Sequence, residues 1–183
     1  MIIGLFGLSG SGKSTLSSQL VNSLPKFVNT KASKLIADSQ HTILLNDLDR
    51  EVVGDNQDAL ILGFDEFCKN NIGKNIIIEV HNVIETKSEA VEVDNDVFLK
   101  LKLDGACFIS VDPSRLFHQR LSDLSRTRFN VSIENLAKLQ NKSLSIFESL
   151  QLNEKLIIKS DYHHQLENFI RRIDHQKKLY RKS

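Results

Sequence analysis

The sequence has little of what makes linkers, disulfide frameworks or membrane segments. Its 183 residues include only eight glycines and two prolines, so long flexible linkers are not expected. The two cysteines, Cys68 and Cys107, lie far apart and lack the paired spacing of a zinc site or a disulfide framework. The apolar run near the N-terminus is about five residues long, too short for a signal-peptide core or a membrane span. We therefore expect a protein of the cytoplasm with no membrane partner.

An excess of charge of either sign is also missing. The sequence has 24 Lys and Arg against 23 Asp and Glu, a formal net charge of +1. A dedicated nucleic-acid-binding domain would be strongly basic, so neither DNA nor RNA is expected as a partner. A hydrophobic content of 40% argues against a disordered acidic chain. At this length, we expect one compact domain that spans residues 1–183.

Short apolar runs alternate with segments of helical spacing along the chain. The apolar and β-branched runs predict strands at residues 2–6, 27–29, 76–79, 106–111 and 156–158. Apolar residues three and four apart predict helices at 13–24, 31–39, 55–70, 116–124, 133–150 and 163–179. Strands that alternate with helices indicate an α/β fold with a parallel sheet. Residues 85–104 show the least regular pattern, and most of this segment is expected to be loop.

A glycine-rich segment joins the first predicted strand to the first predicted helix. Residues 7–14 read Gly-Leu-Ser-Gly-Ser-Gly-Lys-Ser, which matches the phosphate-loop (Walker A) pattern. Glycines let backbone N–H groups turn towards phosphate oxygens, and the N-terminus of the following helix adds partial positive charge. Lys13 is expected to reach the β- and γ-phosphates of ATP. The residues predicted to bind ATP are Gly7, Ser9, Gly10, Ser11, Gly12, Lys13, Ser14 and Thr15.

A carboxylate is expected near this loop. Glu79 ends the predicted strand at residues 76–79, where phosphate-loop folds place an acidic residue beside the Mg²⁺ shell. The Ser14 hydroxyl and the Glu79 carboxylate are therefore the predicted ligands of Mg²⁺, the cofactor expected with ATP. The sequence lacks the Asn/Thr-Lys-x-Asp run that reads guanine, which argues against a GTPase.

The segment of residues 120–128, beyond the predicted strand at residues 106–111, contains three arginines. Arg120, Arg126 and Arg128 surround an aspartate that helical spacing would place one turn from the first two of them. Arginines beside a phosphate site neutralise the charge that spreads over the oxygens during phosphoryl transfer. These arginines and Lys13 are the predicted catalytic residues.

Together these motifs resemble the nucleoside monophosphate kinases, most of all the archaeal-type adenylate kinases. Besides the loop, the resemblance rests on Val80-His81, on Asp112-Pro113 and on Asp123-x-x-Arg126-x-Arg128. It implies a three-layer α/β/α fold with a five-stranded parallel sheet and a mobile lid around residues 115–135. It also implies transfer of the γ-phosphoryl group of Mg-ATP to a nucleoside monophosphate, with an AMP-like acceptor favoured. Arg50 and His81 fall where that family binds the acceptor.

The acceptor half departs from the family's pattern. The family's Asp-Thr-His step is Glu79-Val80-His81 here. Its Gly-Leu-Pro acceptor segment has no counterpart between Lys87 and Phe98, where the chain is acidic instead. A paired arginine of the lid appears as Gln119-Arg120. The donor half is therefore the better-defined part of the site.

The sequence is also compatible with two other functions. The loop also looks like those of gluconate and adenylylsulfate kinases, which phosphorylate hydroxyl groups. Such an acceptor would want a carboxylate base, and Glu79 or Asp47 is the candidate. The second alternative is a nucleotide-gated ATPase or binding module that acts on a protein partner.

Overall fold

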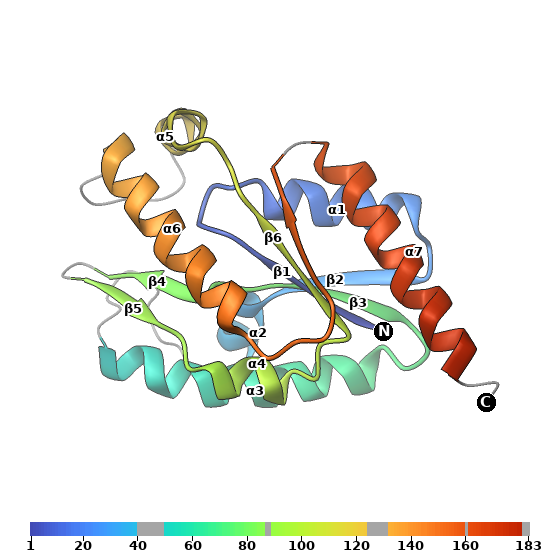
Figure 1. The fold of residues 1–183 in the computed structure, drawn as a ribbon. Coiled ribbons are helices and arrows are strands. Elements are labelled where there is room, and N and C mark those ends of the chain that lie inside the picture. The colour runs from blue at the N-terminus through green and yellow to red at the C-terminus, as the bar shows by residue number, and fades with distance from the viewer. Residues whose placement is uncertain (40–49, 87–88, 124–131, 160, 181–183) are drawn as a thin grey trace.

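The computed structural model describes residues 1–39, 50–86, 89–123, 132–159 and 161–180, with the backbone alone described at residues 50–55 and 180. Helices and strands alternate along these ranges (Figure 1). Every helix within them falls short of the length and apolar composition that a membrane crossing requires.

A five-stranded parallel sheet forms the centre of the fold, with the strand order β2-β3-β1-β6-β7. The strands are β1 (Ile2–Phe6), β2 (Phe27–Lys31), β3 (Asn75–Glu79), β6 (Gly105–Ile109) and β7 (Lys155–Ile158). β1 is the central strand, with Leu5 opposite Glu79 on one side and opposite Cys107 on the other. The three inner strands are almost entirely buried, because both faces of the sheet are covered.

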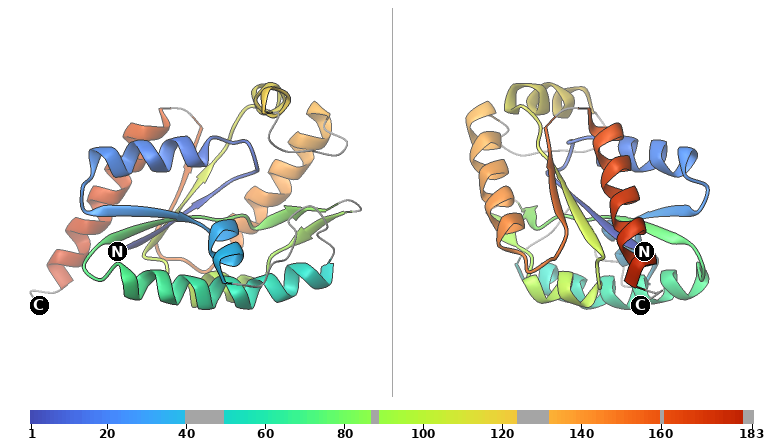
Figure 2. Two further views of the ribbon diagram at one scale, coloured as in Figure 1. Left: turned by 180° about the vertical axis from the view of Figure 1, so that it is seen from behind. Right: turned by 45° about the vertical axis from the view of Figure 1, so that its right-hand side comes forward.

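Helices cover both faces of the sheet and complete a three-layer α/β/α fold (Figure 2). The helices of the sandwich are α1 (Lys13–Ser23), α2 (Ala32–Asp38), α3 (Arg50–Asn70), α4 (Asn95–Lys100), α5 (Pro113–Ser122), α6 (Ile133–Ser149) and α7 (Tyr162–Tyr180). Alternate residues of β1 point to opposite faces, so Leu5 packs with α1 and α7 whereas Phe6 packs with α3, α4 and α6. The predicted α/β fold and its five strands are confirmed.

A second, two-stranded antiparallel sheet consists of β4 (Val83–Glu85) and β5 (Ala90–Glu92). Together with α4 it occupies much of the segment for which loop was expected, so that expectation is wrong. The alternation of buried Val91 and Val93 with exposed acidic residues makes β5 a strand. Asp94 then caps α4, because its carboxylate accepts a hydrogen bond from the backbone N–H of Asp96 at 2.9 Å.

Candidate nucleotide-binding site

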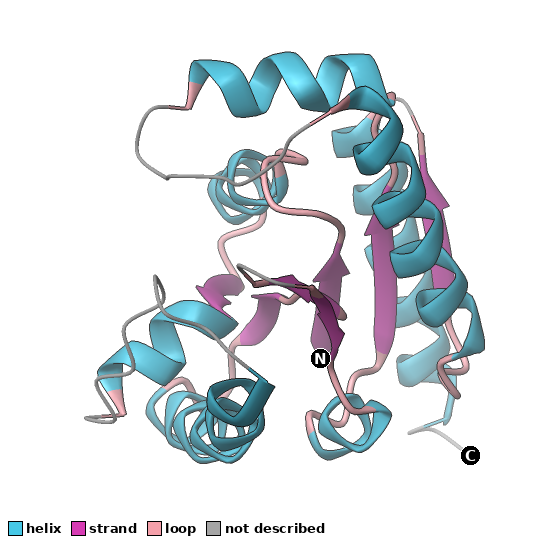
Figure 3. Cartoon of the chain, turned by 90° about the vertical axis from the view of Figure 1, so that its left-hand side faces the viewer, coloured by secondary structure: helices cyan, strands magenta, loops and turns pink. Residues whose placement is uncertain are grey.

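The glycine-rich loop lies where the central strands end. β1, β3 and β6 are parallel neighbours, so their carboxyl ends meet at one edge of the sheet. In Figure 3 the arrowheads of the strands point to this edge, and the loops that follow them are drawn in pink. Open α/β sheets bind their ligands outside this edge, because the connections there diverge and leave room for a ligand.

The backbone of the loop requires glycine at its first position. Gly7 has φ +141°, a conformation that residues with a side chain rarely adopt. A Cβ atom at Gly7 would lie 2.9 Å from the carbonyl oxygen of Ile109 and 2.9 Å from the Ser11 hydroxyl. The loop can therefore lie directly against the end of β6 only because residue 7 has no side chain.

Lys13 is folded back onto the loop. Its ammonium group donates to the carbonyl oxygens of Gly7 at 2.7 Å and Leu8 at 2.9 Å, and the residue is buried. The hydroxyl of Ser11 is also buried and has no hydrogen-bond partner in the described part of the chain. A positive charge and a hydroxyl without a partner thus lie in the same loop, which is the chemistry that a phosphate group requires.

Glu79 is held by hydroxyl groups from α1. One carboxylate oxygen accepts from Ser14 at 2.7 Å, and the other accepts from Ser17 at 2.6 Å. The amide of Asn29, at the edge strand β2, donates in turn to the Ser17 hydroxyl at 3.1 Å. The predicted pair of Ser14 and Glu79 is therefore in direct contact, and Ser17 and Asn29 are supporting residues that the sequence did not reveal.

This arrangement fits Mg²⁺. A serine hydroxyl and a carboxylate are the hard oxygen ligands that Mg²⁺ prefers, and Mg²⁺ normally keeps several waters and phosphate oxygens as its remaining ligands. Among the described residues there is no group of three or more His, Cys, Asp or Glu side chains that would form an all-protein metal cage. Ser14 and Glu79 are thus suited to hold Mg²⁺ that arrives with a nucleotide.

Arg120 connects the loop to the small sheet. It lies in the last turn of α5, a helix that Asp112 caps by accepting from two backbone N–H groups. The Nε–H of Arg120 donates to the carbonyl oxygen of Ser9 at 2.8 Å. Its two terminal nitrogens donate to the two carboxylate oxygens of Glu85 at 2.9 and 2.7 Å. Of the three predicted arginines, Arg120 is thereby placed at the phosphate loop.

Helix α6 is tied to the loops on either side of the site. The Gln140 side chain accepts from the backbone N–H of Val111 at 3.0 Å and donates to its carbonyl at 2.9 Å. Asn82, beyond the end of β3, donates to the Ser143 carbonyl at 2.7 Å and accepts from its hydroxyl at 2.5 Å. Both amides are buried, so these contacts fix α6 relative to the loops after β3 and β6.

Several predicted site residues lie outside the described part of the chain. These are Arg126 and Arg128, the side chain of Arg50, and the candidate base Asp47. His81 is described and half-buried, two residues beyond the end of β3. Thr15 is exposed on α1. The roles assigned to these residues, and the lid around residues 115–135, stay predictions.

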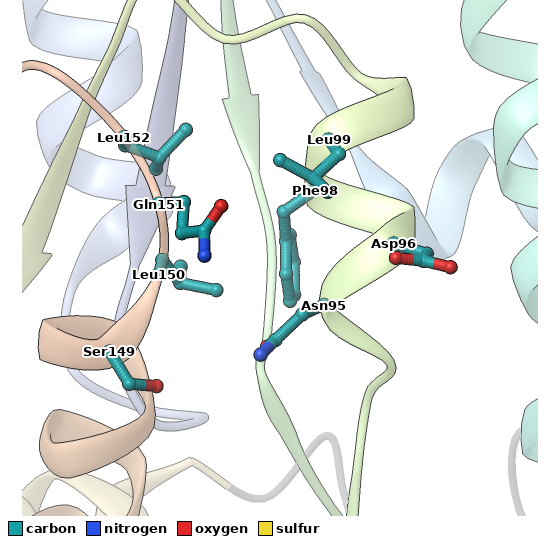
Figure 4. A pocket seen from close by; sticks show the side chains of 8 residues that line it. All are labelled: Asn95, Asp96, Phe98, Leu99, Ser149, Leu150, Gln151 and Leu152. Carbon is teal, nitrogen blue, oxygen red and sulfur yellow. The ribbon is translucent and has the colours of Figure 1, made fainter.

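One pocket of the described surface lies away from the loop. A pocket of about 300 Å³ lies between α4 and the segment that follows α6 (Figure 4). Its lining residues are Asn95, Asp96, Phe98, Leu99, Ser149, Leu150, Gln151 and Leu152. It mixes leucine side chains with amide and hydroxyl groups and includes none of the residues described above for the phosphate loop.

Comparison with known proteins identifies the family. The sequence pattern of the AAA_17 family, described as an AAA domain, matches residues 6–137. No curated protein sequence is significantly similar to the chain. The matched residues include the loop, Glu79 and Arg120.

Solved structures with the same fold include small-molecule kinases. The shikimate kinase from Acinetobacter baumannii in complex with shikimate has a TM-score of 0.63, with 14% identity over 96% of this chain and 94% of that one. The shikimate kinase from Aquifex aeolicus vf5 has a TM-score of 0.59, with 14% identity over 97% and 98% of the two chains. A sugar kinase from Janibacter sp. HTCC2649 has a TM-score of 0.51, with 16% identity over 93% and 90%.

At these identities the likeness shows the fold, which is that of the P-loop kinases. None of the three structures is an adenylate kinase, so the narrower resemblance to the archaeal-type adenylate kinases stays a prediction. The family match covers most of the chain and includes the phosphate loop. The chain therefore belongs to the AAA_17 family of AAA domains.

Proposed function

We propose that this protein is a phosphotransferase that uses Mg-ATP as the phosphate donor. The observation that carries the proposal is the convergence of Lys13, the Ser14–Glu79 pair and Arg120 on one glycine-rich loop. Two cationic side chains and a metal-binding pair at the N-terminus of α1 match the charge of a nucleoside triphosphate. The family and the P-loop kinase fold support this proposal.

Charge stabilisation and alignment account for catalysis at such a site. The loop N–H groups and the Lys13 ammonium would hold the β- and γ-phosphates, and Arg120 would neutralise charge on the transferred group. Mg²⁺ held by Ser14 and Glu79 would supply further neutralisation of the phosphate oxygens. Arg126 and Arg128 are proposed to add positive charge from the lid. Positioning of the two substrates supplies the remaining rate increase.

A nucleoside monophosphate is the acceptor that we favour, and an AMP-like one is the first candidate by resemblance. A phosphate acceptor is already anionic and needs no base, whereas a hydroxyl acceptor needs a carboxylate to take its proton. Glu79 is poorly suited to that task, because it is buried and both its oxygens accept hydrogen bonds from serines. Arg50 and His81 are proposed to contact the acceptor.

A small-molecule hydroxyl kinase is the second candidate. Thr30 lies one residue before the end of the edge strand β2, and its buried hydroxyl has no hydrogen-bond partner among the described residues. A neutral hydroxyl at this edge would suit an acceptor with hydroxyl groups of its own. The shikimate kinases and the sugar kinase with this fold are consistent with such an acceptor.

A product survey with labelled ATP tests both candidates. Purified protein would be incubated with Mg-ATP and either AMP, GMP, CMP, UMP and their deoxy forms or a panel of hydroxylated metabolites, and products followed by ³¹P NMR. We expect a nucleoside diphosphate from at least one monophosphate. A phosphorylated alcohol would support the second candidate instead. Slow hydrolysis without a phosphorylated product, together with ATP-dependent binding of a protein, would support the nucleotide-gated module.

The domain, its lid and its compartment are also part of what we propose. We take residues 1–183 as one kinase domain whose lid lies around residues 115–135. The cytoplasm is the compartment we propose, because ATP is available there as the phosphate donor. Limited proteolysis with and without ATP tests the lid, since closure over a nucleotide would protect that segment from cleavage.

A further inference from the structure

The Glu85–Arg120 ion pair joins two elements that are far apart in the sequence. Glu85 is the last residue of β4, in the small antiparallel sheet, whereas Arg120 contacts the phosphate loop through Ser9. The pair is bidentate, with distances of 2.9 and 2.7 Å between the terminal nitrogens of Arg120 and the oxygens of Glu85. The guanidinium group of Arg120 thereby connects the small sheet to the phosphate loop.

The two partners differ in exposure. The side chain of Arg120 is 1% exposed, whereas that of Glu85 is 37% exposed. The stem of Arg120 also packs on the loop, since a Cβ atom at Gly10 would lie 3.0 Å from its Cγ. Glu85 can therefore move into water at little cost, whereas a buried guanidinium without an anion would carry a large desolvation penalty. If the pair separates, Glu85 is the partner that leaves.

A nucleotide phosphate would compete with Glu85 for the same donors. The paired N–H groups of a guanidinium fit a phosphate in the same two-pronged geometry as a carboxylate. A triphosphate in the loop would also bring several negative charges close to Glu85, and like charges at short range repel each other. Phosphate binding and the contact with Glu85 therefore oppose each other.

We propose that Glu85 is an internal counter-anion that pairs with Arg120 in the nucleotide-free protein. A nucleotide phosphate then displaces Glu85 from Arg120, and the small sheet of β4 and β5 separates from the phosphate loop. This inference rests on the proposed function, because it requires the loop to bind a nucleotide. β4 begins two residues after His81, where the acceptor is expected to bind. Binding of the donor nucleotide would therefore move the small sheet beside the acceptor site.

Nucleotide affinity in charge-neutral variants tests the proposal. Glu85→Gln keeps the size of the side chain and removes the competing charge, so we expect a non-hydrolysable Mg-ATP analogue to bind about fivefold more tightly by titration calorimetry. Glu92→Gln is the matched control, because Glu92 lies on the same small sheet and pairs with Lys142 at 3.0 Å instead. It should leave the affinity unchanged.

The role of Arg120 is tested by repeating the Glu85→Gln change in a variant that lacks the guanidinium group. Arg120→Met keeps an apolar stem to pack on Gly10 but removes the guanidinium. In this background Glu85→Gln should no longer tighten binding, because the competition takes place at Arg120. Equal tightening in both backgrounds would overturn the proposal, since it would show that Glu85 acts only through its charge near the site.

Hydrogen exchange supplies an independent readout that needs no variant. On addition of the non-hydrolysable Mg-ATP analogue to the unmodified protein, amides of β4 and β5 should exchange faster while those at the start of α1 exchange more slowly. Slower exchange in β4 and β5, or an unchanged or weaker affinity in Glu85→Gln, would overturn the inference. A wild-type protein that binds no nucleotide would instead overturn the proposed function, so the two failures are distinguishable.

Discussion

The ammonium group of Lys13 donates a hydrogen bond of 2.7 Å to the carbonyl oxygen of Gly7, the residue that opens the phosphate loop. The lysine predicted to bind phosphate thus also holds the loop in shape. A ligand that enters the loop would meet a positive charge that is already in place, which reduces the entropy lost on binding.

Lys13→Ala should abolish both phosphotransfer and the stabilisation of the fold by ATP. At a ligand concentration of about 100 times Kd, a wild-type protein gains about 2.7 kcal/mol from binding, and the variant should gain almost none of it. Thermal unfolding with and without Mg-ATP measures this difference. Lys26→Ala, at an exposed lysine, is the control and should keep the full stabilisation. Equal stabilisation of the Lys13→Ala variant by ATP would contradict the proposal that the loop binds the phosphates of ATP.

Ser17→Ala should leave the Glu79 carboxylate less firmly oriented. The change removes the hydroxyl that donates to one Glu79 oxygen at 2.6 Å and leaves the amide of Asn29 without its acceptor. Loss of these buried hydrogen bonds should cost about 1–3 kcal/mol of stability. We also expect a higher Mg²⁺ concentration for half-maximal activity, because the carboxylate is less well oriented. Activity measured across a Mg²⁺ titration tests this expectation, with the exposed neighbour Ser18→Ala as control.

Gly7→Ala should destabilise the protein more than Gly73→Ala does. Both glycines have positive φ, at +141° and +82°, so alanine is strained at either position. Only at Gly7 would the new Cβ also lie 2.9 Å from a backbone carbonyl, whereas Gly73 has open space around it. Denaturant unfolding of the two variants should therefore differ by about 1–2 kcal/mol. Equal losses would show that the loop shifts freely away from β6.

The two cysteines should differ in reactivity. Both are free, and burial raises the pKa of the Cys107 thiol far above its usual range. Burial, followed by the nearby charge of Asp65, raises the pKa of Cys68, which is only half-buried. Because the thiolate is the reactive form, a raised pKa means slower reaction at pH 8.

A thiol reagent checks this expectation in the native protein. Cys68→Ser, which leaves Cys107 alone, should show almost no reaction until the protein is unfolded in guanidinium chloride. In the wild-type protein, Cys68 should react slowly at pH 8 and faster as the pH rises, since more thiolate forms. Fast reaction of Cys107 in the folded protein would mean that the core opens locally.

Arg126→Ala tests the lid. Because a lid arginine acts mainly on charge that develops during transfer, turnover should fall by about 100-fold or more while ATP affinity changes little. Turnover rates and calorimetric binding of ATP separate the two effects. The helical arginine Arg171, which pairs with Glu167, supplies a control that should leave both quantities unchanged. Unchanged turnover in Arg126→Ala would show that Arg126 does not contribute to phosphoryl transfer.

Much of the fold follows from local patterns in the sequence. Buried runs such as residues 76–78 are apolar because both faces of the sheet are covered, and this makes them recognisable as strands. The small sheet and α4 escaped prediction because each is short and carries exposed acidic residues such as Glu92 and Asp96. Short elements of this kind are decided by packing rather than by their own pattern.

Some residues of the site are identified by a local motif, whereas others are brought together only by the fold. The loop and its lysine follow from a motif of eight neighbouring residues, so the sequence alone identifies them. Glu85 lies 35 residues before Arg120, and no local pattern connects the two. Ser17 and Asn29 likewise become visible as supports of Glu79 only when α1, β2 and β3 lie together.

The long chain separations within the site have a consequence for synthesis. Glu79 lies 65 residues after Ser14, and Arg120 lies 111 residues after Ser9. A nascent chain that has just released β4 from the ribosome would have the phosphate loop and the acidic Glu85 but not yet the arginine that neutralises it. The affinity for anions should therefore rise as α5 emerges, and nucleotide capture would mark a chain whose second half has already folded onto the first.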